Sequence, residues 1–159
     1  MPHEASQERA EEVSGFFNKE GALEFATHFP GKPYVDTVGT RFSEILRKES
    51  MAVVKSSYFE KQFSEQRPYQ DRASIDPAYF FSGDEVLKQW QKYGARFLMI
   101  VSYSWLSREH PDPEMFHLRR LCKMLEHWRA MQKMDDMFSQ PGPEEFGVII
   151  DFCCLWQML

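Results

Sequence analysis

Two apolar runs decide the fold of this chain: RFLMIVSYSW at residues 96–105 and FGVIIDF at residues 146–152. Both are rich in β-branched and aromatic residues and lack polar alternation, which is typical of strands buried on both faces of a parallel sheet. Between them, from about Glu114, apolar residues recur at helical spacing. These positions are Leu118, Leu121, Cys122, Leu125, Trp128 and Met131. The order of strand, helix and strand predicts a βαβ unit with a right-handed crossover.

A further helix is predicted just before the first of these runs. Ser82 and Glu85 have the spacing of a capping box, in which each side chain accepts a backbone N–H at the helix start. Apolar residues at helical spacing follow at Val86, Leu87, Trp90 and Tyr93. Gly94 then stands where a left-handed glycine ends many helices. The sequence therefore predicts a helix from about Gly83 to Tyr93.

The N-terminal half carries weaker signals. The stretch RFSEILRKESMAVV, residues 41–54, has helical spacing with Thr40 as its N-cap, and RPYQDRASIDPAYF, residues 67–80, is typical of an extended connector. No buried strand comparable to the two later runs is visible there, and two strands with one helix cannot close an α/β layer. We therefore expect residues 83–159 to be the first half of a parallel-sheet α/β domain, truncated after its second strand. Residues 1–82 are expected to be a helical and irregular extension, unless they supply the missing layers.

Composition places the chain among globular proteins. Of its 159 residues, 43% are hydrophobic and 27% are charged, which argues against a disordered chain. The net charge of −5 argues against general nucleic-acid binding, and no apolar window has the length of a membrane span. The start, MPHEASQERAEEV, is not a secretory signal, and three cysteines do not suggest a disulfide framework. We expect a cytoplasmic protein with no membrane or nucleic-acid partner.

Four short motifs carry a resemblance to a known family. Residues 100–105, IVSYSW, resemble the first strand of a Toll/interleukin receptor (TIR) domain, in which F-I-S-Y-S precedes a Trp or His. A group of TIR-like protist proteins has similar features: a Ser-His-Arg-Trp strand, an HPDP loop and an Asp-Tyr-Cys-Ser-Leu-Pro-Gln strand end. Here HPDP stands at residues 110–113 and VIIDFCCLWQ at residues 148–157, while residues 67–80 resemble the connector before the strand.

The match has departures and a second partial likeness. Tyr103 and Ser104 stand where the protist group has His and Arg, and Trp156 stands where it has Pro. Fungal heterokaryon-incompatibility domains share a similar strand end, Trp-x-Asp-x-x-Cys-x-x-Gln. Three of its positions are matched here, by Asp151, Cys154 and Gln157. The first Trp of that pattern is Ile149 in this chain.

The TIR resemblance implies a flavodoxin-like fold with a five-stranded parallel sheet. It also implies one of two activities: homotypic assembly, or cleavage of NAD at the nicotinamide–ribose bond by a glutamate on a later helix. No residue of this chain matches that glutamate. The leading hypothesis is a cytoplasmic signalling or self-association module. The alternatives are a NAD glycohydrolase whose glutamate lies beyond the residues given, with NAD as substrate and no cofactor, and an inactive fragment.

Candidate ligand-binding residues follow the two predicted strands. Ligands of open α/β sheets bind outside the carboxyl ends of the strands. Ser102, Ser104 and Trp105 follow the first strand, where Trp105 could stack on a base or pack against the helix. Asp151 follows the second strand, where it could hold a ribose hydroxyl or bond a neighbouring loop.

The loop after the first strand offers a second pair of candidates. His110 beside Asp112 could serve as a general base, but the sequence favours the simpler role, in which Asp112 caps the long helix with Pro113 at its first position. Cys153 and Cys154 are expected to be small buried hydrophobes, since their spacing does not suit a metal site. The sequence therefore predicts no metal and leaves the catalytic residues open.

Overall fold

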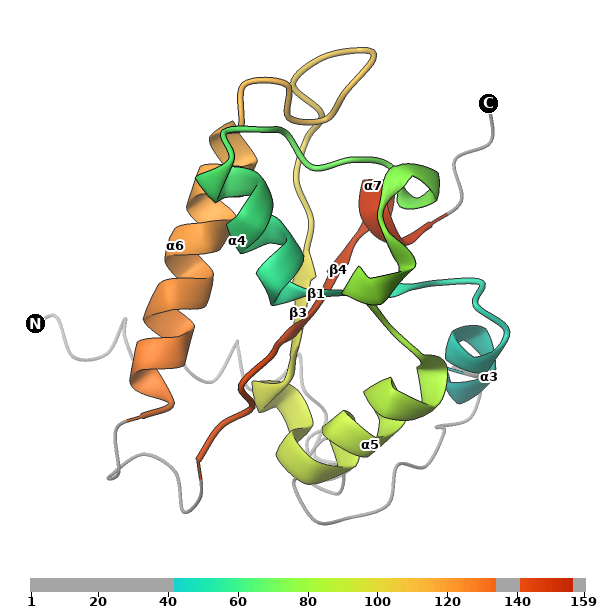
Figure 1. The fold of residues 1–159 in the computed structure, drawn as a ribbon. Helices are drawn as coiled ribbons and strands as arrows, with labels where there is room; N and C mark the ends of the chain where they lie inside the picture. Colours follow the sequence, from blue (N-terminus) through green and yellow to red (C-terminus); the bar gives the residue numbers. More distant parts are fainter. Residues whose placement is uncertain (1–41, 134–140, 156–159) are drawn as a thin grey trace, which may run out of the picture.

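The computed structural model describes residues 42–133 and 141–155, which form a mixed α/β fold around a four-stranded sheet (Figure 1). The strands lie in the order β2-β1-β4-β3. Their bounds are Val53–Lys55 for β1, Phe80–Phe81 for β2, Leu98–Val101 for β3 and Gly147–Ile150 for β4. Strand β1, from the N-terminal half, and strand β4, from the C-terminal end, therefore form the centre of the sheet.

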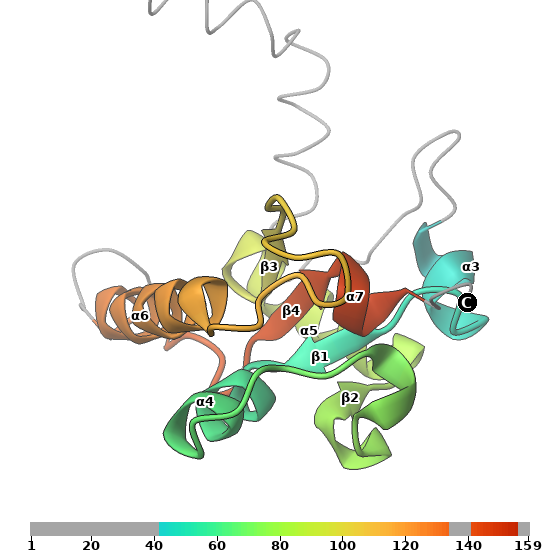
Figure 2. The ribbon, with the colours of Figure 1, turned by 90° about the horizontal axis from the view of Figure 1, so that it is seen from above.

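Five α-helices and three 3₁₀ turns complete the described chain. The helices are α3 (Phe42–Arg47), α4 (Ser56–Ser64), α5 (Gly83–Tyr93), α6 (Phe116–Met131) and α7 (Asp151–Cys154), and the turns are η1 (Arg72–Ser74), η2 (Pro77–Tyr79) and η3 (Gly94–Arg96). Helix α4 packs against α6, and α3 packs against α5. Figures 1 and 2 show these two pairs on opposite sides of the strands. None of the helices in residues 42–133 and 141–155 has the length and apolarity needed to cross a bilayer.

The predicted strand–helix–strand unit is confirmed as β3, α6 and β4. Strands β3 and β4 are parallel, with Leu98 opposite Gly147 and Val101 opposite Ile150. All four residues of β4 are buried, as predicted. The prediction that β3 is buried on both faces is wrong, because β3 is the last of the described strands in the sheet order and Ile100 is 72% exposed.

The expectation of an all-parallel, flavodoxin-like sheet is not met by the described residues. Strand β1 is antiparallel to both of its neighbours, with Val54 opposite Phe80 on one side and Val148 on the other. The helical spacing within residues 41–54 corresponds to α3, which ends at Arg47, and the end of the same stretch forms β1 from Val53. A strand of three residues is too short to show the apolar run that identifies a buried strand.

The sheet joins strands from both sides of the boundary expected after Ser82. The capping box at that boundary is confirmed: the Ser82 hydroxyl accepts the Glu85 N–H at 3.2 Å, and the Glu85 carboxylate accepts the Ser82 N–H at 2.7 Å. Gly94 ends α5 with φ 59°. Thr40, the predicted cap of the first helix, lies outside the described residues.

Candidate functional site

The predicted ligand-binding residues lie around the carboxyl ends of β3 and β4. Ser102 and Ser104 follow β3 and are exposed, and Asp151, also exposed, opens α7 directly after β4. Trp105 is 42% exposed, and its ring meets the buried Phe152 ring edge-on at 5.6 Å. The segment after β3 therefore contacts α7, through the rings of Trp105 and Phe152.

His110 is held by hydrogen bonds on both ring nitrogens. Its Nδ1 accepts the backbone N–H of Asp112 at 2.8 Å, so the proton resides on Nε2, which donates to the Tyr69 carbonyl at 2.8 Å. The Ser107 hydroxyl accepts the His110 N–H at 3.0 Å and donates to the His110 carbonyl at 2.7 Å. Both ring nitrogens of His110 therefore form hydrogen bonds that hold the loop in place. This geometry does not favour the general-base hypothesis.

Asp112 lies before α6 and accepts hydrogen bonds from backbone N–H groups at the N-terminus of the helix. The side chain is fully buried, and its carboxylate accepts the N–H groups of His117 at 3.0 Å and of Leu118 at 2.7 Å. The residue directly before the helix is Met115, in the left-handed conformation with φ 56° and no side-chain cap. Asp112 thus supplies capping hydrogen bonds, as predicted, but it is not the N-cap residue. The prediction that Pro113 opens the helix is wrong, because α6 begins at Phe116.

Tyr103 connects the end of β3 to Tyr69 and to His117. Its hydroxyl is hydrogen-bonded to that of Tyr69, and its ring stacks on the His117 imidazole at 4.3 Å. Burial raises the pKa of both tyrosines far above the ordinary value, which keeps the hydroxyls neutral. We call the six rings that meet here the strand-end cluster: Tyr69, Tyr103, Trp105, His110, His117 and Phe152.

The remaining candidates of this region have structural partners. The Asp151 carboxylate accepts the Phe152 N–H at 2.7 Å. Cys153 and Cys154 are completely buried, as expected for small hydrophobes. Burial raises the pKa of the Cys154 thiol to about 11, so this thiol is protonated at neutral pH.

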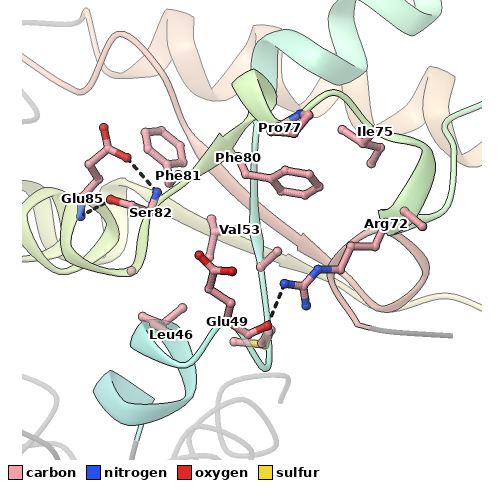
Figure 3. Close-up of a pocket in the computed structure, with 14 residues that line it drawn as sticks. Leu46, Glu49, Val53, Arg72, Ile75, Pro77, Phe80, Phe81, Ser82 and Glu85 are labelled. Atoms are coloured by element: carbon pink, nitrogen blue, oxygen red, sulfur yellow. Dashed lines mark hydrogen bonds between the residues drawn. The ribbon is translucent and has the colours of Figure 1, made fainter. Parts of the chain in front are cut away.

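A second site was missed by sequence reasoning. A cavity of about 460 Å³ opens beside β1 and β2, and Figure 3 shows the side chains around it. We call it the β1–β2 pocket. Its apolar walls come from the end of α3, from β1 and β2 and from the turns between them, and they include Leu46, Met51, Val53, Ile75, Phe80 and Phe81. The adjacent phenylalanines before the Ser82 cap were the one local signal of this wall.

Arg72 closes one side of the β1–β2 pocket. The residue is only 8% exposed, and its guanidinium donates to three backbone carbonyls. Nη2 donates to Glu49 at 2.7 Å, and Nη1 donates to Cys154 at 3.1 Å and to Ser50 at 3.4 Å. Burial lowers the pKa of Arg72, although the nearby Glu49 carboxylate acts in the opposite direction. Arg72 therefore ties η1 to the loop after α3 and to the end of α7.

Two carboxylates lie among the pocket residues. Glu85 is committed to the capping box, and its hydrogen bonds with Ser82 lower the pKa of the carboxyl group. Glu49 lies in the loop after α3, and Figure 3 shows its carboxylate directed towards Val53 and Ser82. The pocket thus combines apolar walls, a buried guanidinium committed to carbonyls, and a carboxylate at its rim.

Within residues 42–133 and 141–155, no three His, Cys, Asp or Glu side chains gather in a way that could hold a metal ion. No protein-family model matches this chain, and comparisons with curated proteins and with solved structures gave no match either.

Proposed function

We propose that the protein is a self-association module of the TIR-like signalling type, acting in the cytoplasm, and that two copies pair through strand β3. The observation that carries this proposal is the uncharged edge of the described sheet at Leu98–Val101, where Ile100 is exposed and the other three residues are half-buried. The outer side of β3 pairs with no described strand, and Ile100 is the most exposed large apolar side chain of the described chain.

The composition of this edge supports pairing with a second copy. Monomeric proteins guard an exposed edge strand with charges, proline or a bulge, because the unpaired N–H and C=O groups of an edge can template another strand. Strand β3 is Leu-Met-Ile-Val, with no charge and no proline. A two-fold axis would bring two such edges together antiparallel, which is the commonest symmetry of homodimers. We infer a continuous sheet across two protomers.

The test is the oligomeric state of wild type and of two lysine variants. We expect sedimentation velocity to show a mass that rises with concentration for the wild type. Ile100→Lys places a charge on the edge and should weaken association by about tenfold or more, whereas a charge away from the interface should have little effect. Met124→Lys is the matched control, because Met124 is also exposed, at 52%, but lies on α6. A wild type that stays monomeric, or equal effects of the two variants, would refute the proposal.

A nucleotide-binding function is the second candidate, and the half-exposed Trp105 beside α7 favours it. Trp105 could stack on the nicotinamide or adenine of NAD, with Ser104 and Asp151 near the sugar. NAD should then raise the melting temperature of the protein, with nicotinamide release as the further sign of an enzyme. If NAD causes no shift and the protein stays monomeric, the inactive-fragment hypothesis is the one that survives.

A further inference from the structure

We propose that the β1–β2 pocket binds a small organic cation, in which an ammonium group is attached to an aromatic or branched apolar body. This inference is independent of the self-association proposed above, because the pocket and the exposed edge lie at different strands of the sheet: β1 and β2 line the pocket, and β3 forms the edge. The proposal rests on the shape of the cavity, on the commitment of Arg72 and on the position of Glu49.

The size and walls of the pocket suit the apolar body of such a ligand. Its volume of about 460 Å³ lies within the range of about 300–1,000 Å³ that is typical of small-molecule sites. Figure 3 shows the Phe80 ring and the Ile75 side chain facing the hollow. An aromatic or branched group of the ligand would exchange water for these apolar surfaces.

The positive charge of Arg72 is already committed to the fold. Its guanidinium donates to the carbonyls of Glu49, Ser50 and Cys154. An anionic ligand would have to compete for these donors and would leave carbonyl groups without their partner, which is costly in a buried place. The charged group that remains for a ligand is therefore a carboxylate, and it selects a cation.

Glu49 is the carboxylate that we assign to the ammonium group. It forms no ion pair with any described residue, unlike Glu44, Glu60 and Glu65. Its direction at the pocket rim is visible in Figure 3. Glu85 is less suited, because its carboxylate already accepts the Ser82 N–H. The Phe80 ring also lines the pocket, and the face of an aromatic ring attracts cations.

Glu49 and Gln66 have the same left-handed backbone conformation, so the two positions provide a variant and a matched control. Glu49 has φ 55°, its N–H donates to Leu46 and the Ser50 N–H donates to Ile45. This is the Schellman motif, in which glycine is the preferred residue at the left-handed position. Gln66, with φ 54°, ends α4 in the same motif, away from the pocket. Glu49→Gly and Gln66→Gly therefore relieve the same backbone conformation, but only the first removes a carboxylate from the pocket.

The test uses three probes of similar shape on the full 159-residue chain. These are 3-phenylpropylammonium, 3-phenylpropanol and 3-phenylpropanoate, titrated while backbone amide resonances are followed by NMR. We expect the ammonium probe to shift the amides of Val53 and Phe81 and to bind about tenfold more tightly than the carboxylate probe. Glu49→Gly should weaken the ammonium probe about threefold, as expected for an exposed ion pair, and leave the alcohol probe unchanged. Gln66→Gly should leave all three affinities unchanged.

Several results would overturn the proposal. The first is tighter binding of 3-phenylpropanoate, which would show that Arg72 recruits an anion. The second is an equal effect of Glu49→Gly and Gln66→Gly on the ammonium probe. The third is the absence of shifts at the pocket amides with every probe. Melting temperatures no lower than that of the wild type, which we expect for both glycine variants, ensure that a loss of binding is not a loss of fold.

Discussion

Strands β3 and β4 are parallel neighbours of four residues each, but they differ in burial: β4 is buried throughout, and β3 is partly exposed. Strand β4 has a partner on each side, and all its residues are buried. Strand β3 has one partner among the described strands, and Ile100 is 72% exposed. Both strands come from apolar runs of the same character, so an apolar run indicates a strand without showing whether it is central or at an edge.

The comparison is tested most directly with one substitution made in both strands. Ile150 on β4 is 1% exposed, whereas Ile100 on β3, which lies opposite Ile149, is 72% exposed. Ile150→Ala should lower the free energy of unfolding by about 3 kcal/mol, because it leaves a cavity in the core. In the unassociated protomer, Ile100→Ala should cost about 0.5 kcal/mol or less, as is usual at the surface. Urea denaturation of the two variants, at protein concentrations too low for association, measures both values, and similar losses would show that Ile100 is buried within the protomer.

Gly147, at the start of β4, is packed too tightly to accept a side chain. A Cβ at this position would lie 2.7 Å from Val53 Cγ1 and 2.9 Å from Phe97 Cζ, closer than real contacts allow. Gly147→Ala should therefore cost about 2 kcal/mol, since the core must shift to accept the methyl group. Ser102→Ala, just beyond β3, is the control and should stay within about 0.5 kcal/mol of wild type. Equal thermal stabilities of the two variants would contradict the packing around Gly147.

Alkaline pH should also lower the stability of the fold through Cys154, which lies directly after β4, with the smallest effect of the three. The Cys154 Sγ accepts the Ile150 N–H at 3.2 Å, and burial raises the pKa of this thiol from 9.0 to about 11. The folded state holds the proton more tightly than the unfolded state. The resulting stabilisation is complete below pH 9 and is lost as pH rises through 11.

This linkage gives a loss of about 1 kcal/mol from Cys154 by pH 10. Cys154→Ala should accordingly show a shallower fall in stability between pH 8 and pH 10, measured by urea denaturation at each pH. Ile100→Ala, on β3, should keep the wild-type slope. A Cys154→Ala slope equal to that of wild type would show that the thiol titrates normally.

The elements that could be predicted from the sequence are those with local signals. Helix α5 is bounded by Ser82 and Gly94, and the β3–α6–β4 unit has long apolar runs and a helical stripe. Strands β1 and β2 have three and two residues, and they exist because β4 lies beside β1. No short-range pattern contains that information, so the mixed direction of the sheet could not be predicted.

The site was predicted in part for the same reason. Trp105 and His110 follow the same strand, and both rings contact Phe152. The sequence could not reveal that the Tyr69 carbonyl would engage the His110 ring. For the β1–β2 pocket, the only local signal was the pair of phenylalanines before Ser82. The buried Arg72 stands in a polar connector and contacts its carbonyl partners only in the folded protein.

The pairing of β1 with β4 also governs the order in which the protein can fold on the ribosome. Val54 is translated early, but its partner Val148 emerges only after the intervening helices have been made. Until then the nascent chain presents one open side of its central strand, a state that favours chaperone binding and aggregation. A fold whose central pair is so distant in the chain has a high contact order, and we expect it to form slowly and late.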